Sequence, residues 1–263
     1  MTLTERQVKG SWLQHVALLA LRSFDWKWMQ GVQWMNEKAS RNQAYNPTTI
    51  EHVANVVTHG VWVLPSMLAG LELLQRARTW PQYFSALVYG AALILLFTVS
   101  TFFHSVFFYC NQNRHLKDAL HRGDRAMIYV FIAASYFPWV TLQPMPVDEW
   151  VAELWWLVWL LASLGIAYQQ VFHERYKCLE TCVYLLMAVA PSLAMFYSTL
   201  AGLYELKVGG LVYMVGVMFF KADGKIPCAH AIWHVFVVMA SSIHYFAVLS
   251  YLYPSHDLGT RSD

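Results

Sequence analysis

The stretch Pro227-Cys228-Ala229-His230-Ala231-Ile232-Trp233-His234 decides the fold, because it places two histidines four residues apart where a long apolar run begins. Residues i and i+4 lie on one face of an α-helix, one turn apart. Proline is favoured in the first turn of a helix, so we predict a helix over 229–253 whose opening turns carry both imidazoles. This spacing is typical of metal ligands, and polar side chains in so apolar a segment need partners.

The composition indicates a membrane protein. Of the 263 residues, 57% are apolar and only 13% are charged, which is too apolar for a soluble chain of this length. Segments long enough to cross a bilayer recur along the chain. We therefore predict an all-α fold, a bundle of seven transmembrane helices over 53–75, 83–110, 125–143, 150–172, 179–201, 205–221 and 229–253.

The basic residues predict the orientation of the bundle. We place the N-terminus in the cytosol, because with seven spans most of the 18 Lys and Arg residues then lie on the cytosolic side. The luminal or extracellular side holds only Arg76, Arg78, Lys207 and Arg261. The C-terminus then lies on the luminal or extracellular side. The basic residues act as topological signals, so the net charge of +2 predicts no nucleic-acid partner.

The same distribution divides the chain into three parts. We expect a cytosolic N-terminal segment at 1–45, whose tryptophans alternate with basic residues as in a helix lying in the membrane interface. The seven-helix membrane domain covers 46–253, and a short luminal or extracellular tail follows at 254–263.

Polar residues at helical spacing, or at the start of a helix, also occur in or just before the first three predicted spans: Glu51, Asn55, His59, Ser100, His104 and Asp124. Taken singly, each has two interpretations. The polar side chains can form hydrogen bonds that only pack helices together, or they can support or ligate a metal ion. A carboxylate at the start of a helix can simply interact favourably with the helix dipole.

The alternating topology favours a shared site. The beginnings of the first, third and seventh helices and the end of the second meet at one membrane face, so we expect one leaflet to hold His59, Ser100, His104, Asp124, His230 and His234. Three imidazoles with an open fourth position fit a Zn²⁺ site. Imidazole ligands without a thiolate favour zinc over iron or copper.

A base for hydrolysis must come from outside the histidine motif. A zincin helix carries Glu directly after its first histidine, but this chain has Ala231 there. Asp124 is the candidate that holds and deprotonates a water, and Ser100 can hydrogen-bond to that water or to the developing oxyanion. Glu51, Asn55 and His59 are expected to support the ligands from the first helix.

These residues resemble the motifs of a known family. The patterns Glu51-x3-Asn55-x3-His59, Ser100-x3-His104 with Asp124, and His230-x3-His234 on the last helix are similar to the three motifs of the progestin and adipoQ receptor (PAQR) family, related to bacterial haemolysin III proteins. Stretches 130–139, 219–224 and 226–234 resemble most the monocyte to macrophage differentiation factor branch. The resemblance covers about residues 46–253.

The resemblance implies a function as well as a fold. It implies that His104, His230 and His234 bind zinc, that Asp124 holds the reacting water, and that Ser100 lies beside it. Adiponectin receptors of this family are linked to hydrolysis of ceramide. The macrophage-differentiation branch is associated with Golgi and late endosomal or lysosomal membranes and with Ras and ERK signalling. The implied partners are therefore the membrane, a ceramide-like lipid substrate and proteins of the Ras/ERK pathway.

Two functional hypotheses follow, and of the two the sequence favours a zinc-site membrane protein of the signalling type that can also have lipid amide hydrolase activity. In the first, the chain is a zinc-dependent, ceramidase-like lipid amide hydrolase that works from the cytosolic leaflet. In the second, zinc holds helices together in a non-enzymatic signalling receptor or scaffold. A transporter is less favoured because the sequence has no broken helix pair or inverted repeat.

Overall fold

The computed structural model describes residues 31–40, 45–109, 114–143, 153–196 and 202–255. It divides into a unit of residues 1–34 and a unit of residues 35–263. Of the first unit only residues 31–34 are described, so the architecture below is that of the second. The predicted interfacial helix before residue 31, and most of the tail predicted at 254–263, lie outside the described residues.

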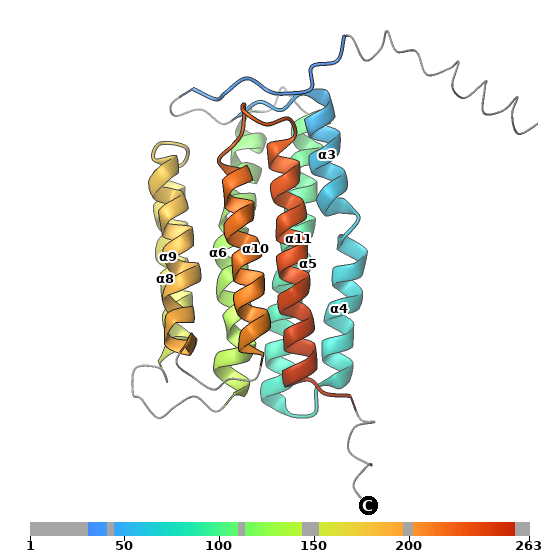
Figure 1. Ribbon diagram of the computed structural model, residues 1–263, viewed down its shortest axis with the longest axis vertical. Coiled ribbons are helices and arrows are strands. Elements are labelled where there is room, and N and C mark those ends of the chain that lie inside the picture. The colour runs from blue at the N-terminus through green and yellow to red at the C-terminus, as the bar shows by residue number, and fades with distance from the viewer. Residues whose placement is uncertain (1–30, 41–44, 110–113, 144–152, 197–201, 256–263) are drawn as a thin grey trace, which may run out of the picture. The chain divides into compact units, whose positions relative to one another are not determined.

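All regular elements within the described ranges are helices, as predicted (Figure 1). They are α3 (Thr49–Gly60), α4 (Val63–Arg76), α5 (Trp80–Tyr109), α6 (Arg114–Leu142), α8 (Leu154–Val171), α9 (Lys177–Phe196), α10 (Leu203–Phe220) and α11 (Ala229–Leu252).

Six helical stretches in the described part of the chain are long and apolar enough to cross a membrane. They are α3 with α4, then α5, α6, α8, α10 and α11, and they match six of the seven predicted spans. The remaining predicted span, 179–201, coincides with α9, which is not among the six. Its described part carries Lys177 and Glu180 in its first turn and ends at Phe196.

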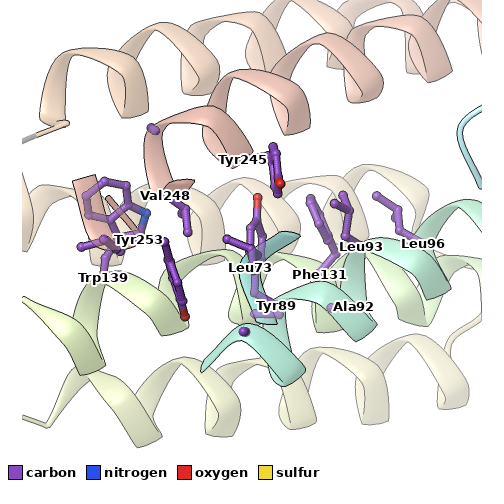
Figure 2. Close-up of a cluster of buried hydrophobic side chains, with 14 of the residues drawn as sticks. Leu73, Tyr89, Ala92, Leu93, Leu96, Phe131, Trp139, Tyr245, Val248 and Tyr253 are labelled. Atoms are coloured by element: carbon purple, nitrogen blue, oxygen red, sulfur yellow. The ribbon is translucent and has the colours of Figure 1, made fainter. Parts of the chain in front are cut away.

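The helices of the 35–263 unit stand side by side, with α5 packed along α6 and α10 packed along α11 (Figure 1). A buried apolar cluster joins α4, α5, α6 and α11, and includes Leu73, Tyr89, Phe131 and Val248 (Figure 2). Tyr245 packs in this cluster and donates its hydroxyl hydrogen to the carbonyl of Ala69 at 3.0 Å. Such hydrogen bonds and close packing hold helices together where lipid removes the hydrophobic driving force.

The first predicted span is interrupted. We predicted one helix over 53–75, whereas the chain ends α3 at Gly60 and starts α4 at Val63. Pro65 explains the break, since it has no N–H to donate to the carbonyl of Val61 and is favoured in the first turn of a new helix. The interruption leaves α3 as a separate half-span.

The helix predicted to begin near residue 125 begins earlier, at Arg114. The helix thus includes the polar segment before Asp124, which the predicted span 125–143 left outside. Arg122 pairs with Asp118 one turn away at 3.0 Å, and Arg125 donates to His121 at 3.2 Å. Because i,i+4 pairs of this kind support a helix, α6 extends well beyond its apolar part, and His121 is buried.

Candidate metal centre

Three histidines meet where α5 ends and α11 begins. His230 and His234 lie in the first two turns of α11, and His104 lies in the last two turns of α5. Each offers a ring nitrogen, and these nitrogens all lie within 4.8 Å of one another. His104 and His234 are buried, and His230 is partly buried. The sequence-based prediction thus named a set of histidines that the fold brings together.

The ring nitrogens of this group have the features of metal ligands. Both nitrogens of His104, and Nδ1 of His230, are buried without a hydrogen-bond partner among the described residues. Unpaired buried polar atoms are costly, so a ligand is expected there. A tetrahedral zinc ion about 2.0–2.1 Å from each nitrogen sets the nitrogens about 3.4 Å apart. A small inward movement of the rings therefore produces that geometry, and the residues fit a bound ion.

The third ligand is oriented by a residue that sequence reasoning missed. Nδ1 of His234 lies 3.0 Å from Oγ1 of Thr58. The hydroxyl of Thr58 already donates to the carbonyl of Ala54 at 2.7 Å, so it accepts from the Nδ1–H of His234. This arrangement leaves Nε2 of His234 as the nitrogen that can face an ion, which is the usual support for a ligating histidine. Thr58 lies between Asn55 and His59 on α3, close to a stripe that the spacing did identify.

His59 supports the same ring from another side. Its imidazole stacks on His234 with ring centroids 3.7 Å apart, and it also packs edge-on against Phe97. His59 is not part of the converging group of nitrogens. That His59 supports the ligands stays a prediction, and this stacking is the contact through which it would act.

Asp124 and Ser100 lie beside the histidines. The hydroxyl of Ser100 hydrogen-bonds to the carboxylate of Asp124. Both residues line a cavity of about 260 Å³ that is also lined by His59, His230 and His234. The rest of its wall is partly apolar, with Leu96, Phe103, Ile128, Phe220, Trp233 and Val237. The arrangement can hold a water next to a metal ion, with room for an apolar substrate.

Glu51 and Asn55 act farther from the cavity. Glu51 caps α3 together with Thr48, and its carboxylate also accepts from the backbone N–H of Asn36 and of Cys228, both at 3.3 Å. Asn55 donates to the hydroxyl of Tyr45 at 2.9 Å. The ring of Tyr45 lies against His230 with centroids 5.0 Å apart. Both residues therefore fix the segments that surround the ligands.

A second group of potential ligands, His121, His173 and Glu174, lies near the start of α6. His121 and His173 approach each other at 3.2 Å, and Arg125 holds Glu174 and Glu180 at 2.7 Å each. Burial acts to raise the pKa of Glu174, but Arg125 and Lys177 outweigh it and lower the pKa. Because cations already occupy the carboxylates, we interpret this group as a charge-compensated network that ties α6 to α9.

The cavity also contains Asp223, which sequence reasoning did not select. It lies in the connection between α10 and α11, and its carboxyl lines the cavity together with Asp124. The signal was its position in the stretch 219–224, which was noted only as part of a resemblance.

Comparisons with known proteins agree with this architecture. The family model described as "Haemolysin-III related" matches residues 48–245. The human "Monocyte to macrophage differentiation factor" is 41% identical over 224 residues, which cover 85% of this chain and 93% of that protein. The "Hemolysin-3 homolog" of Bacillus subtilis is 36% identical over 211 residues, covering 78% of this chain and 95% of the relative. "Hemolysin-3" of Bacillus cereus is 30% identical over 228 residues, which cover 84% of this chain and 99% of that protein. The chain therefore belongs to the haemolysin III-related (PAQR) family of membrane proteins.

Proposed function

We propose that the chain is a membrane-embedded, zinc-dependent hydrolase that cleaves the acyl amide of a ceramide-like lipid. The observation that carries this proposal is the cavity beside the three histidines. Structural zinc sites are closed by four protein ligands, whereas catalytic sites keep one position open. Here His230, His234 and the Asp124–Ser100 pair line a partly apolar space of about 260 Å³, and a ring nitrogen of His104 lies within 4.8 Å of those of the two histidines.

The residues have distinct roles in this reaction. His104, His230 and His234 would hold the zinc, and Thr58 orients the ring of His234. When bound, the ion supplies a Lewis acid that polarises water and the acyl carbonyl. Asp124 takes a proton from the attacking water, and the hydrogen bond from Ser100 keeps the carboxylate turned toward the cavity.

We infer the wider setting from the sequence. Seven spans with a cytosolic N-terminus put the cavity near the cytosolic leaflet, where an acyl chain can reach its apolar wall. By resemblance to its relatives, the chain is expected in Golgi or late endosomal and lysosomal membranes.

The decisive experiment uses detergent-purified, zinc-loaded protein and measures fatty acid released from an N-acyl lipid amide. We expect release by the wild type, and a loss of about 10²–10⁴-fold in Asp124→Asn, the range expected for a general base. The zinc content of this variant should stay unchanged. Asp118→Asn is the matched control, because its carboxylate is 55% exposed on the same helix. Unchanged release in Asp124→Asn would refute the mechanism.

A second candidate function is a receptor or scaffold in which the ion only holds the bundle together. Its support is that the ligands come from α5 and α11, so one ion would cross-link helices distant in the sequence. Together with the Ras/ERK association of similar proteins, this favours a signalling role. In that case zinc-loaded protein releases no fatty acid, and ERK activation in cells survives Asp124→Asn but fails when the cytosolic segments are removed.

A further inference from the structure

We propose that Asp223, in the connection between α10 and α11, donates the proton that the leaving amine requires when an acyl amide is hydrolysed at this site. The proposal rests on the hydrolase function proposed above and adds a second catalytic residue to it. It begins from the observation that two carboxyl groups, those of Asp124 and Asp223, line one cavity beside the histidines.

The backbone around Asp223 holds its side chain in place. The carbonyl of Ala222 accepts from the N–H of Lys225 at 2.9 Å and from that of Ile226 at 3.1 Å, which closes a tight turn around Asp223. Gly224 follows with a φ of +70°. A Cβ added to Gly224 would lie 2.5 Å from the Cα of Lys38, so the two backbones are in close contact. The turn is therefore packed against a neighbouring segment and presents Asp223 to the cavity in a defined position.

The surroundings of Asp223 keep part of its population protonated near neutral pH. Burial, and then the nearby charge of Glu51, raise the pKa of Asp223 to about 7, while Arg125 and Lys177 act to lower it. Glu174 also raises the pKa, and the hydroxyl of Tyr45 lies close enough to interact with the carboxylate. A carboxyl group of this kind can both release and regain a proton at the working pH.

The other acidic groups near the cavity are already engaged. Glu51 accepts three backbone N–H groups, from Asn36, Thr48 and Cys228. Asp124 is bonded to Ser100 and is assigned to the water. Asp223 is thus the carboxyl group in the cavity wall that remains available to a leaving group.

The proton transfers of the two residues balance. The water gives one proton to Asp124, and its oxygen forms a bond to the acyl carbon. The C–N bond then breaks, and the nitrogen takes the proton of Asp223, because an alkyl amide anion is far too basic to leave unprotonated. Return of the proton from Asp124 to Asp223 through solvent restores both groups. The products are a fatty acid and an amine. Two carboxyl groups with different surroundings and opposite roles are a common arrangement in hydrolases.

The test compares two substrates that differ only in their need for a proton. Zinc-loaded wild type and Asp223→Asn are assayed with an N-acyl alkylamine lipid and with the 4-nitrophenyl ester of the same fatty acid, whose leaving group departs as an anion. We expect Asp223→Asn to lose about 100-fold or more on the amide and less than about threefold on the ester, with zinc content unchanged. Wild-type amide cleavage should fall above about pH 7, and ester cleavage should not show that decrease. Asp118→Asn again serves as the matched control.

The outcomes separate the two proposals. An equal loss on both substrates, or no loss on the amide, overturns the role of Asp223 while leaving the hydrolase intact. If wild type cleaves neither substrate, the hydrolase function itself fails and takes this proposal with it. Should Asp223→Asn lose zinc or fail to fold, Asp223→Glu provides the test. The Asp223→Glu variant keeps an ionisable carboxyl group, so it must retain amide cleavage with a shifted pH dependence. If this variant cleaves the ester but not the amide, proton donation by residue 223 is contradicted.

Discussion

Replacing Thr58 by valine tests whether the candidate site holds its ligands as the geometry indicates. Valine has nearly the same shape as threonine but cannot accept the hydrogen bond that Nδ1 of His234 makes at 3.0 Å. Loss of a supporting hydrogen bond to a ligating histidine lowers metal affinity about 10–100-fold, or about 1.4–2.7 kcal/mol.

The structure places the expected effect at the lower end of this range. The backbone carbonyl of Asn55 also interacts favourably with the ring of His234, so the variant keeps part of the support for its N–H. We therefore expect about a tenfold weaker zinc affinity for Thr58→Val, near 1.4 kcal/mol. Thr58→Ser keeps the hydroxyl and should bind zinc as the wild type does.

The assay is competition with a chromogenic zinc chelator in detergent, with the protein at equal concentration in each sample. Wild type and Thr58→Ser should bind zinc with equal affinity, and Thr58→Val should bind it more weakly. If Thr58→Val binds zinc as tightly as wild type, then either His234 does not ligate through Nε2 or the histidines do not bind zinc. His234→Ala distinguishes these cases, because it must lose the ion in the first and change nothing in the second.

Three further predictions concern stability, measured as the thermal unfolding midpoint in detergent. Arg125→Met leaves Glu180 buried without its cation and leaves Glu174 with Lys177 alone, which should cost about 3–5 kcal/mol, and adding Glu174→Gln with Glu180→Gln should recover part of the loss. Gly209→Ala puts a Cβ 2.3 Å from Cδ2 of His244 and should cost about 1–3 kcal/mol of unfolding free energy. The control Gly210→Ala has nothing within 4 Å of its Cβ, so it should be neutral or stabilise by up to about 1 kcal/mol. Equal effects of the two substitutions would contradict the packing of α10 on α11. Burial raises the pKa of Asp223 to about 7, so the unfolded chain binds fewer protons than the folded one between about pH 4 and 7. Wild type should therefore lose stability relative to Asp223→Asn as the pH rises through that window, and parallel curves would refute the shift.

Much of the site follows from periodicity alone. The spacing of His230 and His234, and of Ser100 and His104, fixes their faces on two helices, and alternating topology fixes the shared membrane level. The same fold places Nε2 of His244 3.2 Å from the carbonyl of Leu206. Spacing is informative here because a bilayer restricts the chain to helices of known length and alternating direction.

The failures have a common physical origin. The start of α6 was predicted too late because hydropathy detects only the apolar part of a helix. The i,i+4 pair of Asp118 and Arg122 was the signal that the helix continues. Thr58 and Asp223 were missed because threonine and aspartate are common near helix ends, and only the fold shows which of them meets a histidine or a cavity. The network of Arg125 joins residues on separate helices that no spacing relates.

The carboxylate of Glu51 has a consequence for how the protein is made. One of its acceptor contacts is to Cys228, 177 residues later in the chain and immediately before α11. The capping box of α3 is local, but the bond from Cys228 forms only after the segment before α11 has been made, and α11 also carries His230 and His234. Metal uptake then becomes a marker of finished assembly, since a chain stalled before α11 lacks both the ligands and the contact that seats them. Long-range contacts of this kind form late. A pulse-labelled chain should become resistant to protease at the time when it first retains zinc.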